Sequence, residues 1–118
     1  FGLLGHAREL AIASQVSLIF DAKRVAFLPE ALAYSREGHL AGGLKRNAEF
    51  LAGCVQFDDG IPEEVRNLFY DPQTSGGLLL AVEACEAANL VKALEARGVP
   101  AWEVGEAVTK TKPLLAIR

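Results

Sequence analysis

The sequence lacks several features that mark whole classes of protein. It has no run of about 20 apolar residues, which a membrane-spanning helix needs, and no basic segment followed by an apolar stretch at its start, which a secretory signal needs. Its net charge of −3 gives no basic excess, so we expect neither a nucleic-acid partner nor a membrane. Cysteine is scarce, and Cys54 and Cys85 have no metal-ligand spacing, which predicts a reducing cytoplasm and small core residues rather than reactive thiols.

Methionine is missing altogether, yet apolar residues recur at three- and four-residue spacing from the first positions onward. This spacing predicts a helix over residues 1–14. Because the helix opens without an initiator methionine, we expect the chain to be a piece of a longer protein. Gly2 and Gly5 each weaken a helix by about 1 kcal/mol. Close approach of another backbone or of a phosphate would explain them, and so would tight helix packing.

Hydrophobic residues make up 51% of the 118 residues, enough for a single domain over residues 1–118 with its own core. Helical and strand patterns are mixed without strict alternation, which is typical of the α+β class. The expected elements are one long strand or two short ones within 15–28, a helix at 29–36, a short helix after about residue 43, a strand at 54–58, a helix from residue 62, a strand at 77–82, a helix at 84–97, and two closing strands within 101–108 and 113–118. The apolar run GLLLAV at 77–82 predicts a central strand covered on both faces.

A polar corner, DPQTSGG, leads directly into this apolar run. Asp71 precedes a proline and is therefore expected to be extended, with its carboxylate accepting backbone N–H groups of the turn. Thr74, Ser75, Gly76 and Gly77 supply consecutive N–H donors. Adjacent glycines permit a positive φ, which lets N–H groups converge on an anion. The corner is therefore predicted to hold a phosphate or to lock against another domain.

A second glycine-rich stretch, GGLKRN, places two glycines before Lys45, Arg46 and Asn47. The two cations have the chemistry to meet phosphate oxygens. Neither stretch has the spacing of a Walker loop, and no Ser–His–Asp set or paired acid and base can be identified. Glycine pairs also occur in ordinary turns, so each stretch alone leaves a purely structural role open.

The segments FGLLGHARELA, GGLKRN and DPQTSGGLLLAV, in this order and spacing, resemble the C-terminal domain of selenophosphate synthetase (selenide, water dikinase). The resemblance covers essentially the whole chain and places it in the aminoimidazole ribonucleotide synthetase-like superfamily. It implies a layered α/β/α domain with a mixed, mainly antiparallel sheet that is partly ferredoxin-like. It also implies a phosphotransferase that makes selenophosphate from selenide and ATP, releases AMP and orthophosphate, and uses Mg²⁺.

The resemblance further implies that much of the enzyme lies outside these residues. The family's catalytic cysteine or selenocysteine and its lysine lie in an N-terminal glycine-rich segment, and a metal-binding aspartate lies just before the phenylalanine that matches Phe1. We therefore expect no catalytic residue, no metal ligand and no bound cofactor in this chain, and no selenophosphate synthesis by the chain alone. The residues carried over as support for the nucleotide and phosphate region or for the domain interface are Gly2, Gly5, Lys45, Arg46, Asn47, Asp71, Thr74, Ser75, Gly76 and Gly77. The expected partner is the N-terminal domain of the same enzyme, within a homodimeric parent, docked on an exposed apolar patch.

Two alternatives remain at this stage. In the first alternative, the chain is the C-terminal domain of another ATP-dependent enzyme of the same superfamily; the DPQTSGG and GGLKRN segments argue against it. In the second, the chain is a non-catalytic, ferredoxin-like module that binds a small anion or a partner and works as an independent protein.

Overall fold

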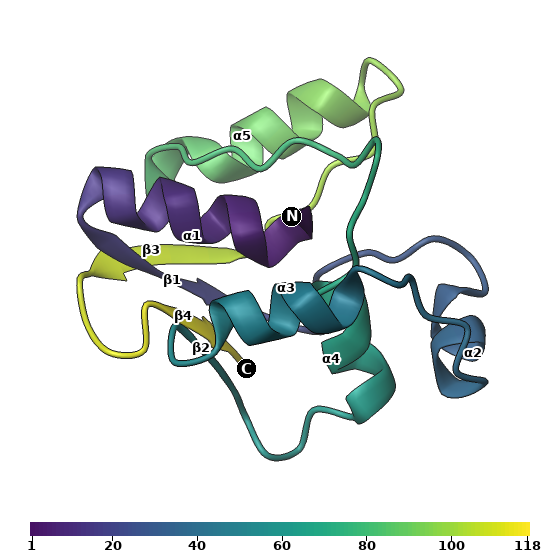
Figure 1. Cartoon of the computed structure of the whole chain (residues 1–118). Coiled ribbons are helices and arrows are strands. Elements are labelled where there is room, and N and C mark those ends of the chain that lie inside the picture. Colours follow the sequence, from purple (N-terminus) through teal and green to yellow (C-terminus); the bar gives the residue numbers. More distant parts are fainter.

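A computed structural model of the chain describes residues 1–118 and contains five helices and a four-stranded mixed sheet (Figure 1). The helices are α1 (Gly2–Ser14), α2 (Ala31–Arg36), α3 (Leu44–Leu51), α4 (Glu63–Phe69) and α5 (Ala84–Glu95). The strands are β1 (Val16–Phe20), β2 (Val55–Phe57), β3 (Gly105–Thr109) and β4 (Leu115–Ile117). The predicted α+β class is confirmed, and none of the helices combines the length and apolar character of a membrane span.

The strand order in the sheet is β2-β4-β1-β3. Strand β4 pairs in parallel with both β1 and β2, and only β3 runs antiparallel to its neighbour β1. The expected mainly antiparallel sheet is therefore wrong in that detail, because two of the three pairings are parallel. The reason is that β3 and β4, although consecutive, are separated by β1. Their connection crosses the start of β1, where the Ser17 hydroxyl donates to the Thr111 carbonyl oxygen (3.1 Å) and accepts the Thr111 N–H (2.8 Å).

The core lies between one face of this sheet and helices α1, α3 and α4. The apolar residues of α1 that enter this core, Leu4, Ala7 and Ala11, recur at helical spacing, which confirms the predicted apolar face. The register between β1 and β4 places their buried side chains on the same face of the sheet, since Leu18 pairs with Leu115 and Phe20 with Ile117. The buried apolar residues of the cluster are Leu4, Ala7, Ala11, Leu18, Phe20, Leu51, Ile61, Phe69, Leu115 and Ile117.

Most predicted elements occur within a few residues of their expected positions. The strand within 15–28 is the single short β1, and the expected helix at 29–36 begins only at Ala31. Pro62 precedes α4 as its N-cap, with Glu63 and Glu64 in the first turn, as the helix-start pattern predicts. The predicted helix at 84–97 is α5, and the two closing strands are β3 and β4.

The predicted central strand at 77–82 is wrong. These residues form no strand, and the Leu78 and Leu80 side chains are 90% and 55% exposed, while Leu79 packs against the core cluster. The reason is topological. Strand β1 is already bonded to β4 on one side and β3 on the other, so the middle of the sheet offers no free edge to this segment.

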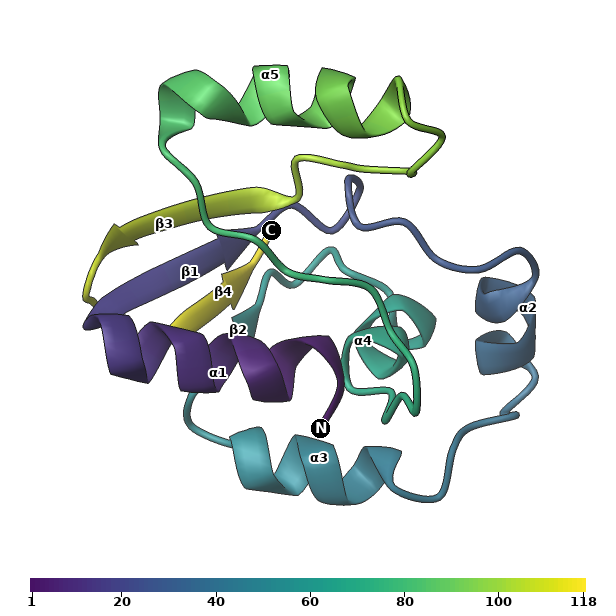
Figure 2. The ribbon, with the colours of Figure 1, turned by 90° about the horizontal axis from the view of Figure 1, so that it is seen from above.

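Helix α5 follows this segment and lies on the far side of β3 from α1 and α3 (Figure 2). It has no buried residue, in contrast with α1, which packs on the sheet. Helix α5 thus lies beyond the edge strand β3 and packs closely against no other element, so the expected second layer of an α/β/α arrangement is not formed.

Candidate functional site

The three sequence segments that carry the family resemblance meet at the beginning of α1. Asn47 in α3 is buried, and its side-chain Nδ2 donates to the carbonyl oxygens of Tyr70 (3.0 Å) and Phe1 (3.4 Å). One amide therefore joins the start of α1, helix α3 and the residue just before the DPQTSGG corner. A buried amide that satisfies two main-chain acceptors fixes the relative positions of all three segments.

Glycines make this junction possible because the backbones approach closely. Gly2 has a φ of +66°, and a Cβ atom at this position would overlap the carbonyl oxygen of Asp71. A Cβ atom at Gly43 would lie 3.2 Å from Cγ of Pro72. The close approach predicted at Gly2 is therefore made by another backbone segment of this chain, and the junction holds Gly2, Asn47 and Asp71 together.

Asp71 and its neighbour Tyr70 are partly enclosed at the junction. Burial raises the pKa of the Asp71 carboxyl, and burial, partly offset by the nearby Arg66 charge, raises the pKa of the Tyr70 phenol. The Asp71 carboxylate accepts no hydrogen bond from the turn that follows, so the predicted capping of that turn is wrong. Instead, the Asp71 N–H donates to the Leu68 carbonyl oxygen (3.3 Å) at the end of α4.

The corner from Thr74 to Gly77 lies on the surface. All four residues are exposed, and neither Gly76 nor Gly77 has a positive φ. A Cβ atom at Gly77 would meet nothing within 4 Å. The expectation that positive φ angles at the two glycines aim N–H groups at an anion is therefore wrong, and the phosphate or interface role of the corner stays a prediction.

Lys45 and Arg46 project from α3 on its exposed side, while Asn47 points inward. Neither cation lies within ion-pair distance of a carboxylate. The sequence-predicted site therefore divides into a buried junction and an exposed rim. The junction contains Gly2, Gly5, Asn47 and Asp71, and the rim contains Lys45, Arg46, Thr74, Ser75, Gly76 and Gly77.

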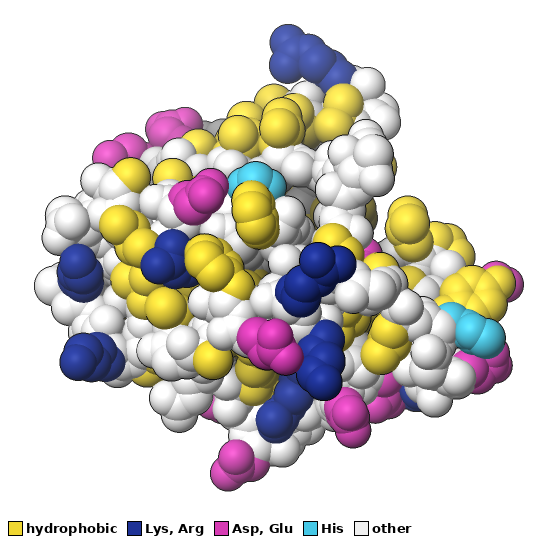
Figure 3. All heavy atoms as spheres, in the orientation of Figure 1, with side chains coloured by type: hydrophobic (Ala, Val, Ile, Leu, Met, Phe, Trp, Pro, Cys, Tyr) yellow, Lys and Arg dark blue, Asp and Glu magenta, His cyan; other side chains and the backbone are white.

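A surface cluster beside the junction was not predicted. Phe1 and Phe50 are 64% and 55% exposed, with ring centroids 6.0 Å apart, and the Arg8 guanidinium carbon lies 5.0 Å from the Phe50 centroid. Figure 3 shows hydrophobic side chains gathered beside basic ones over α1 and α3. No local pattern could have revealed this cluster, because Phe50 is far from the other two residues in sequence.

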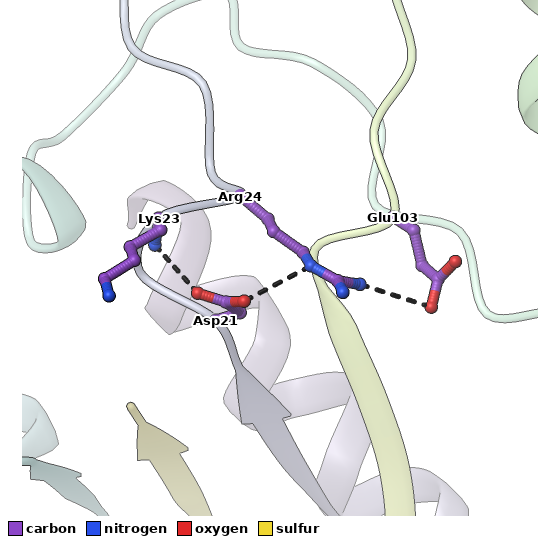
Figure 4. A network of polar contacts seen from close by, with 4 residues as sticks. All are labelled: Asp21, Lys23, Arg24 and Glu103. Atoms are coloured by element: carbon purple, nitrogen blue, oxygen red, sulfur yellow. Dashed lines mark hydrogen bonds and ion pairs between the residues drawn. The ribbon is translucent and has the colours of Figure 1, made fainter.

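A polar network at the end of the sheet was also not predicted (Figure 4). Arg24, after β1, lies 3.2 Å from the Asp21 carboxylate and 3.5 Å from the Glu103 carboxylate, and the Lys23 N–H donates to Asp21 (2.9 Å). It borders an open hollow of about 500 Å³ that Trp102 also lines. Since both acids pair with Arg24, the network ties the segment after β1 to the segment before β3.

Other reactive groups are dispersed. Cys54 is half-buried and Cys85 is exposed, so the expectation that both are small core residues is wrong for Cys85. No group of three or more His, Cys, Asp or Glu side chains gathers closely enough to hold a metal ion. The geometry thus offers a buried junction with an exposed pair of cations beside it.

Comparison with known proteins supports the family resemblance that the three segments carry. The family described as AIR synthase related protein, C-terminal domain, matches residues 1–116. A selenide, water dikinase from Porphyromonas gingivalis is 46% identical over 99 residues, which are 84% of this chain and 28% of that protein. Those from Myxococcus xanthus and Clostridioides difficile are 39% and 35% identical, over 90% and 99% of this chain and 30% and 34% of their own length. The chain therefore spans about three-tenths of the curated relatives it matches.

Proposed function

The chain belongs to the family of AIR synthase related proteins, C-terminal domain, and on this premise we propose that it is the C-terminal domain of a selenide, water dikinase. Relatives of that name align with most of the chain and are about three times longer. In this proposal the additional length includes an N-terminal, ATP-binding domain that precedes Phe1 and carries the nucleophile and the metal-binding carboxylate. The parent enzyme is cytoplasmic and homodimeric.

The proposed parent reaction forms selenophosphate from selenide, water and ATP and releases AMP and orthophosphate, with one phosphoryl group passing to selenide and the other to water. Mg²⁺ supplies neutralisation of phosphate oxygens in such chemistry. The carboxylates of this domain form no metal-binding group, so we assign it no metal ligand. Its own contribution is to present a rigid surface to the nucleotide-binding part of the enzyme.

The observation that supports this proposal is the convergence of the resembling segments at one junction. The Asn47 side chain donates to the Phe1 carbonyl oxygen in the first segment and to the Tyr70 carbonyl oxygen just before the third, and Gly2 lets the Asp71 backbone approach the start of α1. Segments that were read separately in the sequence thus form one structural unit. A unit of this kind positions the residues on its rim, which is what preorganised binding of an anionic substrate requires.

Among the rim residues, Lys45 and Arg46 are the proposed contacts with phosphate oxygens. Both are exposed, and neither is neutralised by a carboxylate of this chain. The exposed amides and hydroxyls from Thr74 to Gly77 are proposed to face the seam between the two domains. The domain alone is proposed to form no selenophosphate.

The proposal is tested on the complete reading frame that contains this domain. We expect the purified protein to release AMP and orthophosphate from ATP only when selenide is present. Lys45→Gln combined with Arg46→Gln is expected to lower kcat/KM, whereas Lys92→Gln, which removes an exposed cation on α5, is expected to leave it unchanged. ATP consumption that is indifferent to selenide contradicts the assignment, and equal rates in all variants contradict the role of the two cations.

The isolated 118-residue chain provides the complementary test. We expect no selenide-dependent consumption of ATP by this chain at concentrations at which the complete protein is active. Turnover by the isolated chain would show that the domain carries its own catalytic groups.

A further inference from the structure

The exposed aromatic rings beside the junction form an ordered cluster. Phe1 and Phe50 lie 6.0 Å apart in a tilted arrangement, and Arg8 stacks over the second ring. His6 meets the Phe1 ring edge-on at a centroid distance of 6.2 Å. More than half of each phenylalanine remains exposed in spite of these contacts. Grouped apolar rings of this kind mark an interaction surface more often than solitary exposed side chains do.

The cluster extends along the two helices that bear it. Ile12 is one turn beyond Arg8 on α1 and is 39% exposed, and Arg46 is one turn before Phe50 on α3. We refer to Phe1, Arg8, Ile12, Arg46 and Phe50 as the Phe1–Phe50 patch. It lies over α1 and α3, where Figure 3 shows hydrophobic and basic side chains together.

The junction holds this patch in place. A Cβ atom at Gly5 would overlap the Cβ of Phe1, so only glycine lets the first residue fold back against α1. The Phe1 carbonyl oxygen accepts the hydrogen bond from Asn47 (3.4 Å), which ties it to α3. The Phe1 ring is therefore held by contacts on both helices, and two residues of the resembling segments, Gly5 and Asn47, serve to present it.

The charges of the patch define the surface that would complement it. Arg8, Lys45 and Arg46 have no carboxylate within 4 Å, and Glu49 is the one acid on α1 and α3 without a partner, since Glu9 contacts His6 (3.5 Å). Nε of Arg8 is buried and makes no hydrogen bond. Phenylalanine and arginine are the residue types enriched at the centres of protein interfaces. A complementary surface is apolar opposite the rings and carries a carboxylate opposite Arg8.

We propose that the Phe1–Phe50 patch is the docking surface for the part of the parent protein that precedes Phe1. This inference rests on the proposed function, which places about two-thirds of the parent outside this chain. A segment that continues from Phe1 leaves the domain within the patch itself, so its covalent attachment gives the preceding part a high local concentration at this surface. The partner surface contains an apolar site for Phe50 and a carboxylate that pairs with Arg8.

The test uses the complete parent protein with a site for a specific protease inserted directly before Phe1. After cleavage we expect the two parts to remain associated, with a dissociation constant that can be measured by titration. Phe50→Ser is expected to weaken the association by about tenfold or more, as truncation of a central interface aromatic does. Leu80→Ser is the matched control, because Leu80 has the same 55% exposure but lies outside the patch. It is expected to change the affinity by less than about threefold.

Unfolding midpoints of both variants are measured to confirm that each folds. The proposal would be overturned if the two parts separate on cleavage, or if the Phe50→Ser variant associates as tightly as the unmodified protein. It would also be overturned if Leu80→Ser weakened the association more than Phe50→Ser does. The proposed function fails separately, if the product of the complete reading frame is not a selenide-dependent enzyme. The association of the two cleaved parts can still be measured in that case.

Discussion

Two regions of this chain are rich in apolar residues but bury them to very different extents. In the packed region, formed by the sheet with α1, α3 and α4, Leu4 and Phe69 are 0% and 1% exposed. In the outer region, residues 77–103, Leu78 and Trp102 are 90% and 57% exposed, and α5 has no buried residue. The difference shows that apolar content alone does not place a segment in the core, because the segment also needs an element to pack against.

Packing partners explain the contrast. The partly buried side chains of α5 are Ala87, Leu90, Val91 and Leu94, so this face is as apolar as a core helix requires, but α5 packs closely against no other element. Little apolar area is therefore removed from water, and the free energy gained by burial scales with that area. In the packed region large side chains meet one another, since Phe69 contacts both Phe27 and Phe57 edge-on at centroid distances of 6.0 and 5.8 Å.

The largest expected effect comes from core truncation. Phe69→Ala should lower the free energy of unfolding by about 3–5 kcal/mol, because it removes a buried ring and leaves a cavity. Leu80→Ala, in the outer region, should change it by less than about 0.5 kcal/mol. Urea denaturation measures both, with Phe69→Leu as the milder variant if the alanine variant does not fold. Equal losses at the two positions would remove the distinction between the regions.

Glycine substitutions sharpen the same comparison at the backbone. Gly2→Ala should cost about 1–3 kcal/mol, because the residue has φ +66° and its Cβ would overlap the Asp71 carbonyl oxygen. Gly77→Ala meets open space at an ordinary φ and should be neutral or stabilising by about 0.4–1 kcal/mol. Thermal and urea unfolding provide the measurement, and a neutral Gly2→Ala variant would contradict the close approach at the junction.

Matched asparagines probe the hydrogen bonds of the junction. Asn47→Ala should cost about 1–3 kcal/mol, because it leaves the Tyr70 and Phe1 carbonyl oxygens without this donor. Asn89→Ala on the exposed surface of α5 should be neutral or slightly stabilising, since alanine favours a helix. Comparable destabilisation of the two variants, measured in urea, would argue that the Asn47 bonds contribute nothing specific.

The smallest expected effect concerns pH and has opposite signs at two carboxylates. Burial raises the pKa of Asp71, so its contribution to stability is greatest below its unfolded pKa and is lost as pH rises through the folded value. The hydrogen bond from Arg36 (2.7 Å) lowers the pKa of Glu64, so that contribution is present at neutral pH and is lost as pH falls through the folded value.

Asp71→Asn should therefore unfold at a urea midpoint equal to or above that of the unmodified chain near about pH 7, and the difference should disappear near about pH 3. Arg36→Gln removes the hydrogen bond to Glu64, so the free energy of unfolding of this variant should decrease less as the pH is lowered. An Asp71→Asn variant that is less stable than the unmodified chain near about pH 7, but equally stable near about pH 3, would contradict the assignment of the Asp71 shift.

Local patterns in the sequence were sufficient for most of the secondary structure. The apolar spacing of α1 and the Pro62 start of α4 depend only on neighbouring residues, and the structure contains both. The pattern at 77–82 misled because an apolar run indicates burial without indicating a partner, and β3 occupies the position beside β1.

The candidate site could be predicted only in part for the same reason. Sequence singled out Gly2, Asn47 and Asp71 as separate features, but their meeting depends on contacts between positions far apart in the chain. The stack of Phe50 on Arg8 could not be predicted, because it requires the relative placement of α1 and α3.

Native-state hydrogen exchange on the isolated chain tests the difference between the two regions most directly. We expect the amides of β1, β4 and α1 to exchange only through global unfolding, and those of α5 to exchange at least about 100-fold faster through local opening, because α5 has no buried residue. Amides of α5 that are as strongly protected as those of β1 would show that the outer region belongs to the core and would contradict the account.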